Sequence, residues 1–126
     1  MAKIIVLGAG RVGRVIARDL NDDPALEVTV ADRDGATLER LGAQHGFATL
    51  TADLADPATI TERVKGFDLV VGALPGFLGL QCLDAVLDAK IPRYVDISFL
   101  PEDPRDRTDR AAAAGTTVLY DIGVAP

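Results

Sequence analysis

Three glycines near the amino terminus have the spacing G-x-G-x-x-G, with Gly8, Gly10 and Gly13 enclosing Arg11 and Val12. Such glycines permit a tight turn, a close approach of backbone to phosphate, and close packing of the next helix. The unpaired amides that begin this helix, and the positive end of its dipole, attract an anion. The motif follows an apolar run and enters an amphipathic segment, so it predicts a phosphate-binding turn. A plain strand-to-helix turn without a ligand is the alternative.

An acidic residue follows at the distance expected for a ligand of a nucleotide ribose. Asp32 lies 19 residues after Gly13, and dinucleotide-binding motifs carry an acid about 20 residues beyond the last glycine. Its carboxylate would accept hydrogen bonds from the ribose hydroxyls and repel a 2′-phosphate, which favours NAD over NADP. The neighbouring Arg33 could bind a 2′-phosphate, stack on the adenine or remain solvated, so NADP stays an alternative.

Two further segments follow predicted strands and should reach the same edge of a parallel sheet. Asp53 and Leu54 could border the adenine, although a polar loop start and a core contact would explain them equally well. Ala73, Leu74 and Pro75 would let ribose and pyrophosphate lie against backbone, although a plain turn also uses the Pro-Gly pair. These five residues complete the predicted cofactor-binding set.

The nicotinamide half and the chemistry have weaker signals. Asp96 and Ser98 lie at the end of the fifth predicted strand, where they could reach the nicotinamide half or serve only to cap the next segment. Residues 123–126 follow the sixth predicted strand and should also approach the nicotinamide side. Cys82 lies in an apolar helix and His45 at a helix end, and both are more simply structural. No Ser-His-Asp, Cys-His or metal-ligand spacing occurs, so we predict neither a catalytic residue nor a metal site.

Short apolar runs alternate with segments of helical period, which is typical of a parallel sheet covered on both faces. The pattern predicts an α/β fold, a single doubly wound (Rossmann) domain with six strands in the order 3-2-1-4-5-6. In the first helix, Val12, Val15, Ile16 and Leu20 are expected to form the buried stripe, and the polar residues 102–110 to form a solvated helix face. The predicted strands are 4–7, 27–31, 48–52, 68–72, 94–97 and 117–120, and the predicted helices are 11–20, 36–44, 57–65, 78–89 and 104–114.

Composition limits the class of protein further. The 126 residues suffice for one domain with a core, and 13 Lys+Arg against 19 Asp+Glu give a net charge of −6. This balance makes nucleic acid an unexpected partner. A single cysteine cannot form an internal disulfide, and the apolar runs are shorter than the ~20 residues of a membrane helix. We expect a soluble, cytoplasmic domain.

Five segments in order resemble the amino-terminal domain of the saccharopine dehydrogenase family, particularly its lysine 6-dehydrogenase and saccharopine reductase-like members. They are IIVLGAGRVG at 4–13, ADR at 31–33, ALPG at 73–76, YVDIS at 94–98 and DIGVAP at 121–126. The resemblance implies an NAD(P)-dependent oxidoreductase that acts on the carbon–nitrogen bond of an amino acid such as lysine, or of a related imine adduct.

The resemblance also implies a second domain. Members of the family continue beyond the motif at 121–126 into a domain that carries the substrate pocket, so residues 1–126 are expected to be a dinucleotide-binding domain separated from it. Such a domain should bind cofactor without turning over by itself, and its exposed surface could favour a homo-oligomer. A nucleotide-sensing regulatory module of a potassium channel or transporter shares the glycine motif and the acid, and is the alternative.

Overall fold

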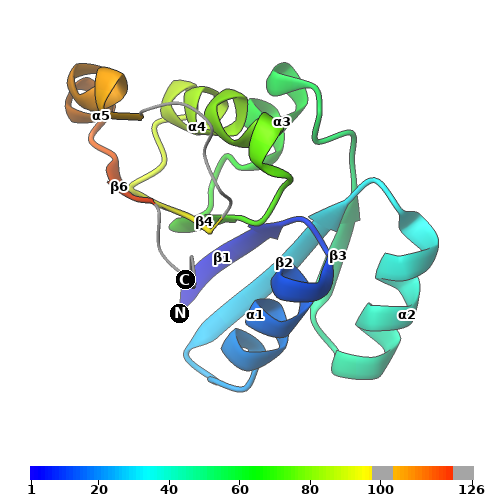
Figure 1. The fold of residues 1–126 in the computed structure, drawn as a ribbon. Coiled ribbons are helices and arrows are strands. Elements are labelled where there is room, and N and C mark those ends of the chain that lie inside the picture. Colours follow the sequence, from blue (N-terminus) through cyan, green and yellow to red (C-terminus); the bar gives the residue numbers. More distant parts are fainter. Residues whose placement is uncertain (98–103, 121–126) are drawn as a thin grey trace, which may run out of the picture.

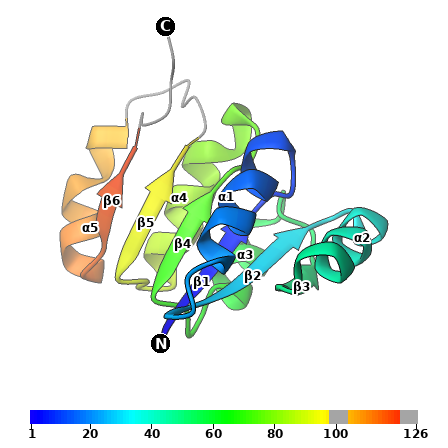
Figure 2. The ribbon, with the colours of Figure 1, turned by 90° about the horizontal axis from the view of Figure 1, so that it is seen from below.

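The computed structural model describes residues 1–97 and 104–120, and within them six parallel strands form one sheet in the order β3-β2-β1-β4-β5-β6. The predicted doubly wound fold is therefore confirmed (Figure 2). The strands are β1 (Ala2–Leu7), β2 (Leu26–Asp32), β3 (Ala48–Thr51), β4 (Leu69–Gly72), β5 (Arg93–Asp96) and β6 (Thr117–Leu119). The helices are α1 (Arg11–Asn21), α2 (Gly35–His45), α3 (Pro57–Arg63), α4 (Gly79–Asp88) and α5 (Thr108–Ala114), with short 3-10 turns η1 (Gly76–Leu78) and η2 (Pro104–Arg107).

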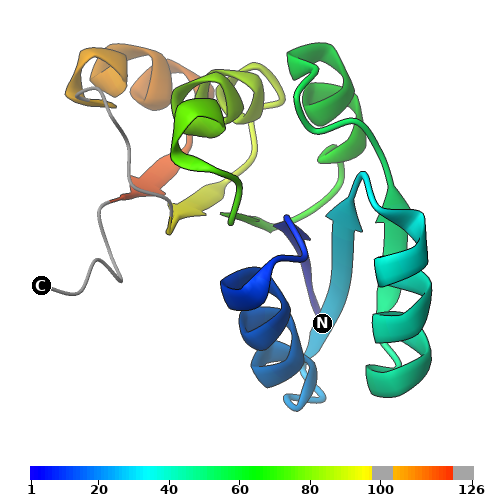
Figure 3. The same ribbon diagram turned by 45° about the vertical axis from the view of Figure 1, so that its right-hand side comes forward.

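The helices cover both faces of the sheet. Helices α1 and α2 lie on one face, and α3, α4 and α5 on the other (Figures 1 and 3). The central strand β1 serves both cores, because successive side chains of a strand point to opposite faces. Ile4 and Val6 pack with α1 and α2, whereas Ile5 and Leu7 pack with α3 and α4. The continuous apolar run of β1 follows from this double burial.

The strand order changes side at β1, because β2 and β3 follow on one side of it and β4, β5 and β6 on the other. Leu7 at the end of β1 pairs with Ala31 of β2 on one side and with Gly72 of β4 on the other. The chain after β1 enters α1 on one face, whereas the chain after β4 enters η1 and α4 on the opposite face. This divergence opens a crevice at the carboxyl ends of β1 and β4, the place where open α/β sheets bind ligands.

The prediction of the buried stripe of α1 is wrong at two positions. Val12 is 60% exposed and Val15 is 41% exposed, whereas Gly13 and Ala17 are the residues of α1 that are buried. The predicted Ile16 and Leu20 are partly buried against the sheet. Because Gly13 lies directly against the backbone of the preceding turn, small residues form the inner face and turn the two valines outward.

Local signals at other helix ends are confirmed. Asp56 caps α3 by accepting a hydrogen bond from the amide of Ala58, and Pro57 begins that helix. Gly46 ends α2 in the left-handed conformation with φ 81°. The predicted helices 78–89 and 104–114 are each preceded by, or begin with, a 3-10 turn, η1 or η2.

Of the expected solvated face over 102–110, the structure describes the burial of 105–110, and these residues are exposed except for the half-buried Arg107. Arg107 donates to both carboxylate oxygens of Asp84 on α4, at 3.1 and 3.2 Å. Arg110 donates to Asp84 at 2.9 Å and to Asp88 at 2.8 Å. These ion pairs attach the polar segment to α4. In the described ranges we find neither a helix long and apolar enough to cross a membrane nor a metal-binding group of His, Cys, Asp or Glu side chains.

Candidate functional site

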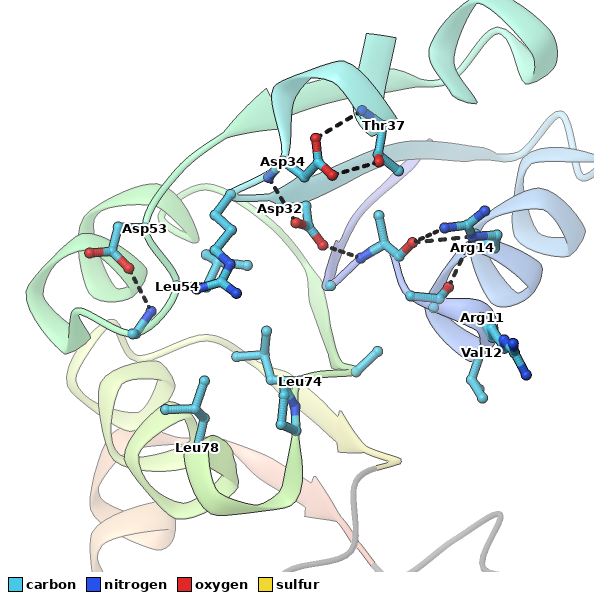
Figure 4. A pocket seen from close by; sticks show the side chains of 18 of the residues that line it. Arg11, Val12, Arg14, Asp32, Asp34, Thr37, Asp53, Leu54, Leu74 and Leu78 are labelled. Atoms are coloured by element: carbon cyan, nitrogen blue, oxygen red, sulfur yellow. Dashed lines mark hydrogen bonds between the residues drawn. The ribbon is translucent and has the colours of Figure 1, made fainter. Parts of the chain in front are cut away.

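A cleft of about 640 Å³ lies at the carboxyl ends of β1 and β4, and the structure brings all twelve sequence-predicted binding residues to its lining (Figure 4). Their shared position follows from the parallel sheet, whose strands all end at one edge. The twelve residues are Gly8, Gly10, Arg11, Val12, Gly13, Asp32, Arg33, Asp53, Leu54, Ala73, Leu74 and Pro75.

The glycine turn is shaped by close backbone contacts. Gly8 has φ 108°, and its amide donates to the carbonyl oxygen of Ala31 at 2.8 Å. A Cβ at Gly8 would lie 2.6 Å from the carbonyl oxygen of Ala73, which leaves no room for a side chain. The turn therefore joins the walls that follow β1 and β4.

The start of α1 presents backbone amides without a capping side chain. Gly10 is the N-cap residue, and no side-chain hydrogen bond caps the helix. The first helical bond runs from the amide of Arg14 to the carbonyl oxygen of Gly10 at 3.0 Å, so the preceding amides of this turn lack an acceptor within the helix. A Cβ added at Gly10 would meet no heavy atom within 4 Å. This space and these amides fit a pyrophosphate.

Asp32 lines the cleft and also forms a hydrogen bond with the glycine turn. One carboxylate oxygen, Oδ2, accepts from the amide of Ala9 at 2.7 Å, and Oδ1 accepts from the amide of Asp34 at 2.9 Å. The sequence suggested only the ribose as its partner. Each carboxylate oxygen has a second lone pair, so a bond to a ribose hydroxyl remains compatible with these two contacts.

Two lining residues beside Asp32 were missed by the sequence reasoning. Asp34 accepts from both the amide and the hydroxyl of Thr37, at 3.1 and 2.8 Å, and so caps α2. The two hydrogen bonds from Thr37 lower the pKa of Asp34 below 3.8. The spacing of Asp and Thr ahead of a helical segment is a capping signal that could have identified this pair.

The adenine-side candidates Asp53 and Leu54 have the structural roles that were considered for them, and they also line the cleft. Asp53 accepts from the amide of Ala55 at 3.1 Å, which forms the turn that leads into α3. Leu54 is only 5% exposed and belongs to the core between the sheet, α3 and α4. Arg33 is exposed at the same end of the cleft.

The opposite wall continues from β4. The amide of Ala73 donates to the carbonyl oxygen of Leu7 at 2.8 Å, and Leu74 packs against the core. Phe77 and Leu78 of η1 extend this wall, and the Phe77 side chain is 78% exposed. Neither residue was predicted from the sequence, although an apolar pair directly after the Pro-Gly turn could have indicated them.

Arg14 contacts the carbonyl side of the glycine turn. Its guanidinium donates to the carbonyl oxygen of Ala9 from Nε at 3.2 Å and from Nη2 at 3.0 Å, and from Nε to the carbonyl oxygen of Gly10 at 3.3 Å. The side chain is half-buried and lines the cleft. The neighbouring Arg11 is exposed and lies on the same side of the cleft (Figure 4).

Asp96 lies in the core and does not line this cleft. It is 1% exposed and accepts from the hydroxyl of Tyr94 at 2.9 Å, and that hydroxyl is 3.3 Å from Sγ of Cys82. Burial raises the pKa of Cys82 to about 12 and that of Tyr94 well above 10.0. Cys82 is confirmed as a core residue. The candidates Ser98 and 123–126 lie outside the described residues.

The sheet order, the glycine turn and the crevice between β1 and β4 define a dinucleotide-binding domain of the Rossmann class. Comparison with known proteins assigns the family. Residues 4–119 match the family described as "Saccharopine dehydrogenase NADP binding domain". The chain belongs to this family of NAD(P)-binding domains of oxidoreductases.

Individual relatives match over most of this chain. A saccharopine dehydrogenase (NADP⁺, L-glutamate-forming) from Saccharomyces cerevisiae is 24% identical over 123 residues, which are 98% of this chain and 27% of that protein. A carboxyaminopropylagmatine dehydrogenase from Synechocystis is 26% identical over 109 residues, with 82% of this chain and 27% of that protein covered. The chain thus spans about a quarter of the length of these relatives.

A solved structure shows the same fold. Apo saccharopine dehydrogenase (L-Glu forming) from Saccharomyces cerevisiae superposes with a TM-score of 0.87 at 23% identity, over 98% of this chain and 27% of that one. The superposition covers nearly the whole chain, so the experimental structure has the same doubly wound fold.

Proposed function

We propose that the chain binds NAD in preference to NADP and serves an oxidoreductase that acts on the carbon–nitrogen bond of an amino acid. The observation that supports it most is the uncapped start of α1, where Gly10 leaves open space in front of backbone amides. Amides at a helix start, with the positive end of the dipole, bind a pyrophosphate. The family match supports the dehydrogenase and not a channel-regulating module.

The remaining lining residues give the cofactor an orientation. Asp32 is suited to the adenosine ribose, and Arg33 to stacking on the adenine. Asp53 and Leu54 would border the adenine at the end of β3. On the opposite wall, backbone and small or apolar side chains from Ala73 to Pro75 would lie along the ribose and pyrophosphate.

Electrostatics at the adenosine end supports the preference for NAD. The residues that line this end include three acids, Asp32, Asp34 and Asp53, beside one cation, Arg33. A 2′-phosphate carries up to two negative charges and would meet an excess of like charge, whereas the hydroxyls of NAD can donate to carboxylates. The family description refers to NADP, so this preference distinguishes the chain from the general description.

The bound cofactor would supply the chemistry by carrying a hydride to or from the substrate carbon. The residues of this chain would hold the dinucleotide and orient it. The substrate class is proposed because the chain belongs to this family and because its sequence resembles the members that act on lysine and saccharopine. We further propose that the substrate pocket belongs to another domain, and that the 126-residue chain alone binds cofactor without turning it over.

Parallel calorimetric titrations with NADH and NADPH test the cofactor proposal. We expect NADH to bind at least about tenfold more tightly, and Arg33→Ala to leave this preference in place. Asp32→Ser should weaken NADH and shift the ratio of the two affinities toward NADPH by about tenfold, since about 1.4 kcal/mol of repulsion would be removed. Equal or tighter binding of NADPH to the unchanged chain would contradict the proposal.

The enzymatic half has a separate test. We expect the 126-residue chain to show no lysine- or saccharopine-dependent reduction of NAD above the buffer control. Substantial turnover by this chain would refute the need for another domain. Sequencing the gene beyond the codon of Pro126, and assaying its whole product with the same substrates, tests the substrate class.

A further inference from the structure

The backbone of Ala9 is held on both sides by charged side chains, one at its amide and the other at its carbonyl oxygen. Oδ2 of Asp32 accepts from the amide of Ala9 at 2.7 Å, and Nη2 of Arg14 donates to the carbonyl oxygen of Ala9 at 3.0 Å. The dashed lines in Figure 4 run from the turn to Asp32 on one side and to Arg14 on the other. Hydrogen bonds with an ionised partner are shorter and stronger than neutral ones.

The arginine contacts determine where the amides of the turn point. In a trans peptide the carbonyl oxygen and the following amide hydrogen point in opposite directions, and the described residues contain no cis peptide. The carbonyl oxygens of Ala9 and Gly10 both face Arg14. The amides of Gly10 and Arg11 therefore point away from Arg14, on the side where the helix start is uncapped.

We propose that Arg14 is a positioning residue, whose guanidinium fixes the phosphate-binding turn in its binding conformation before the cofactor arrives. A planar fork suits this role, because Nε and Nη2 reach carbonyl oxygens of two successive residues. The partner group on the amide side is Asp32, which also bonds to Asp34 and so connects the turn to the start of α2. The functional half of this inference rests on the proposed binding of NAD.

Direct attraction of phosphate by the charge of Arg14 is the competing explanation, and lysine separates the two. Arg14→Lys keeps the positive charge but replaces the fork by one ammonium group. Arg14→Ala removes both. Arg18→Ala is the matched control, because Arg18 lies one turn further along α1, is exposed and pairs with Asp19, and the cleft lining does not include it.

The test combines amide hydrogen exchange of the cofactor-free chain with calorimetric titration by NADH. For Arg14→Ala we expect exchange of the Ala9 amide to accelerate at least about tenfold and NADH to bind about tenfold more weakly. Arg14→Lys should show accelerated exchange and at least about threefold weaker binding, because the charge alone does not hold the turn. Arg18→Ala should match the unchanged chain in both measurements.

Unaltered exchange of the Ala9 amide in Arg14→Ala, or full recovery of exchange and binding in Arg14→Lys, would overturn the positioning role. If alanine prevents folding, the lysine variant still gives both readouts. Failure of the proposed function would look different, because the unchanged chain itself would then not bind NADH. Hydrogen exchange would in that case still decide whether Arg14 orders the turn.

Discussion

Alanine at Gly13 should destabilise the fold, whereas alanine at Gly10 should leave the fold intact and weaken cofactor binding. A Cβ at Gly13 would lie closer than 3.0 Å to the carbonyl oxygen of Gly8, 3.0 Å from its carbonyl carbon and 3.2 Å from Cβ of Ala73. The first two contacts are with backbone, which cannot rotate away, so α1 would have to move off the sheet.

The expected cost at Gly13 combines two effects. Overpacking costs roughly 1–3 kcal/mol, and a clash with backbone belongs at the upper end of this range. Replacing glycine by alanine within a helix returns up to about 1 kcal/mol. We therefore expect the free energy of unfolding of Gly13→Ala to fall by about 2 kcal/mol, and NADH binding to weaken because the turn moves with the helix.

Gly10 has no such packing constraint. Its Cβ would meet nothing within 4 Å, and its φ of −71° and ψ of −171° are accessible to any residue. The change should alter the free energy of unfolding by less than about 1 kcal/mol. The added methyl group would occupy the space proposed for the pyrophosphate, so NADH binding should weaken at least about thirtyfold, which is about 2 kcal/mol.

Urea unfolding and calorimetric titration of the two variants beside the unchanged chain give the required comparison. The expected result is a stability loss confined to Gly13→Ala and a binding loss with full stability in Gly10→Ala. Wild-type affinity for NADH in Gly10→Ala would refute the placement of the pyrophosphate. Equal loss of stability in both variants would refute the claim that, of these two glycines, only Gly13 is required for packing.

Two further predictions concern the core behind the site, and a third concerns the attachment of α5 to α4. Gly72→Ala should lower the free energy of unfolding by about 2 kcal/mol, because its Cβ would lie within 3.0 Å of the buried Tyr94 hydroxyl and ring; adding Tyr94→Phe should recover part of this loss in urea unfolding. Burial raises the pKa of Cys82 from 9.0 to about 12, so its contribution to stability is complete below pH 9 and is lost as the pH rises toward 12. Urea unfolding between pH 8 and 11 should show this decline, with a slope of up to about 1.4 kcal/mol per pH unit from this thiol, and Cys82→Ala should flatten it while the part due to Tyr94 persists. Asp84→Ala should cost about 1.5 kcal/mol in thermal or urea unfolding, because it removes the carboxylate that holds two arginines of η2 and α5; an unchanged midpoint would show that these ion pairs are only surface contacts.

The strand order and twelve residues of the cleft lining were predictable from the sequence. Runs such as 4–7 show burial on both faces, and parallel strands place the residues that follow them at one edge. Asp32, Leu54 and Ala73 are far apart in the chain but share the cleft for this reason.

The predictions that failed depend on contacts between elements. The apolar period of α1 indicated Val12 as a buried residue, but the close approach of the backbone at Gly13 decides which face is inward. The bonds of Asp32 to the Ala9 amide and of Arg14 to the Ala9 carbonyl oxygen depend on the orientation of the two peptide planes that flank Ala9, which residue types and spacing do not specify. The pairing of Arg107 with Asp84 likewise requires the packing of α4 against the segment that contains η2 and α5.

Titration of the isotope-labelled chain with NADH, followed residue by residue through the backbone amide signals, tests the central claim most directly. We predict saturable changes that are largest at Gly10, Arg11 and Val12, with smaller changes near Asp32 and Ala73. No saturable change, or changes concentrated on α5 and β6 at the other end of the sheet, would contradict it.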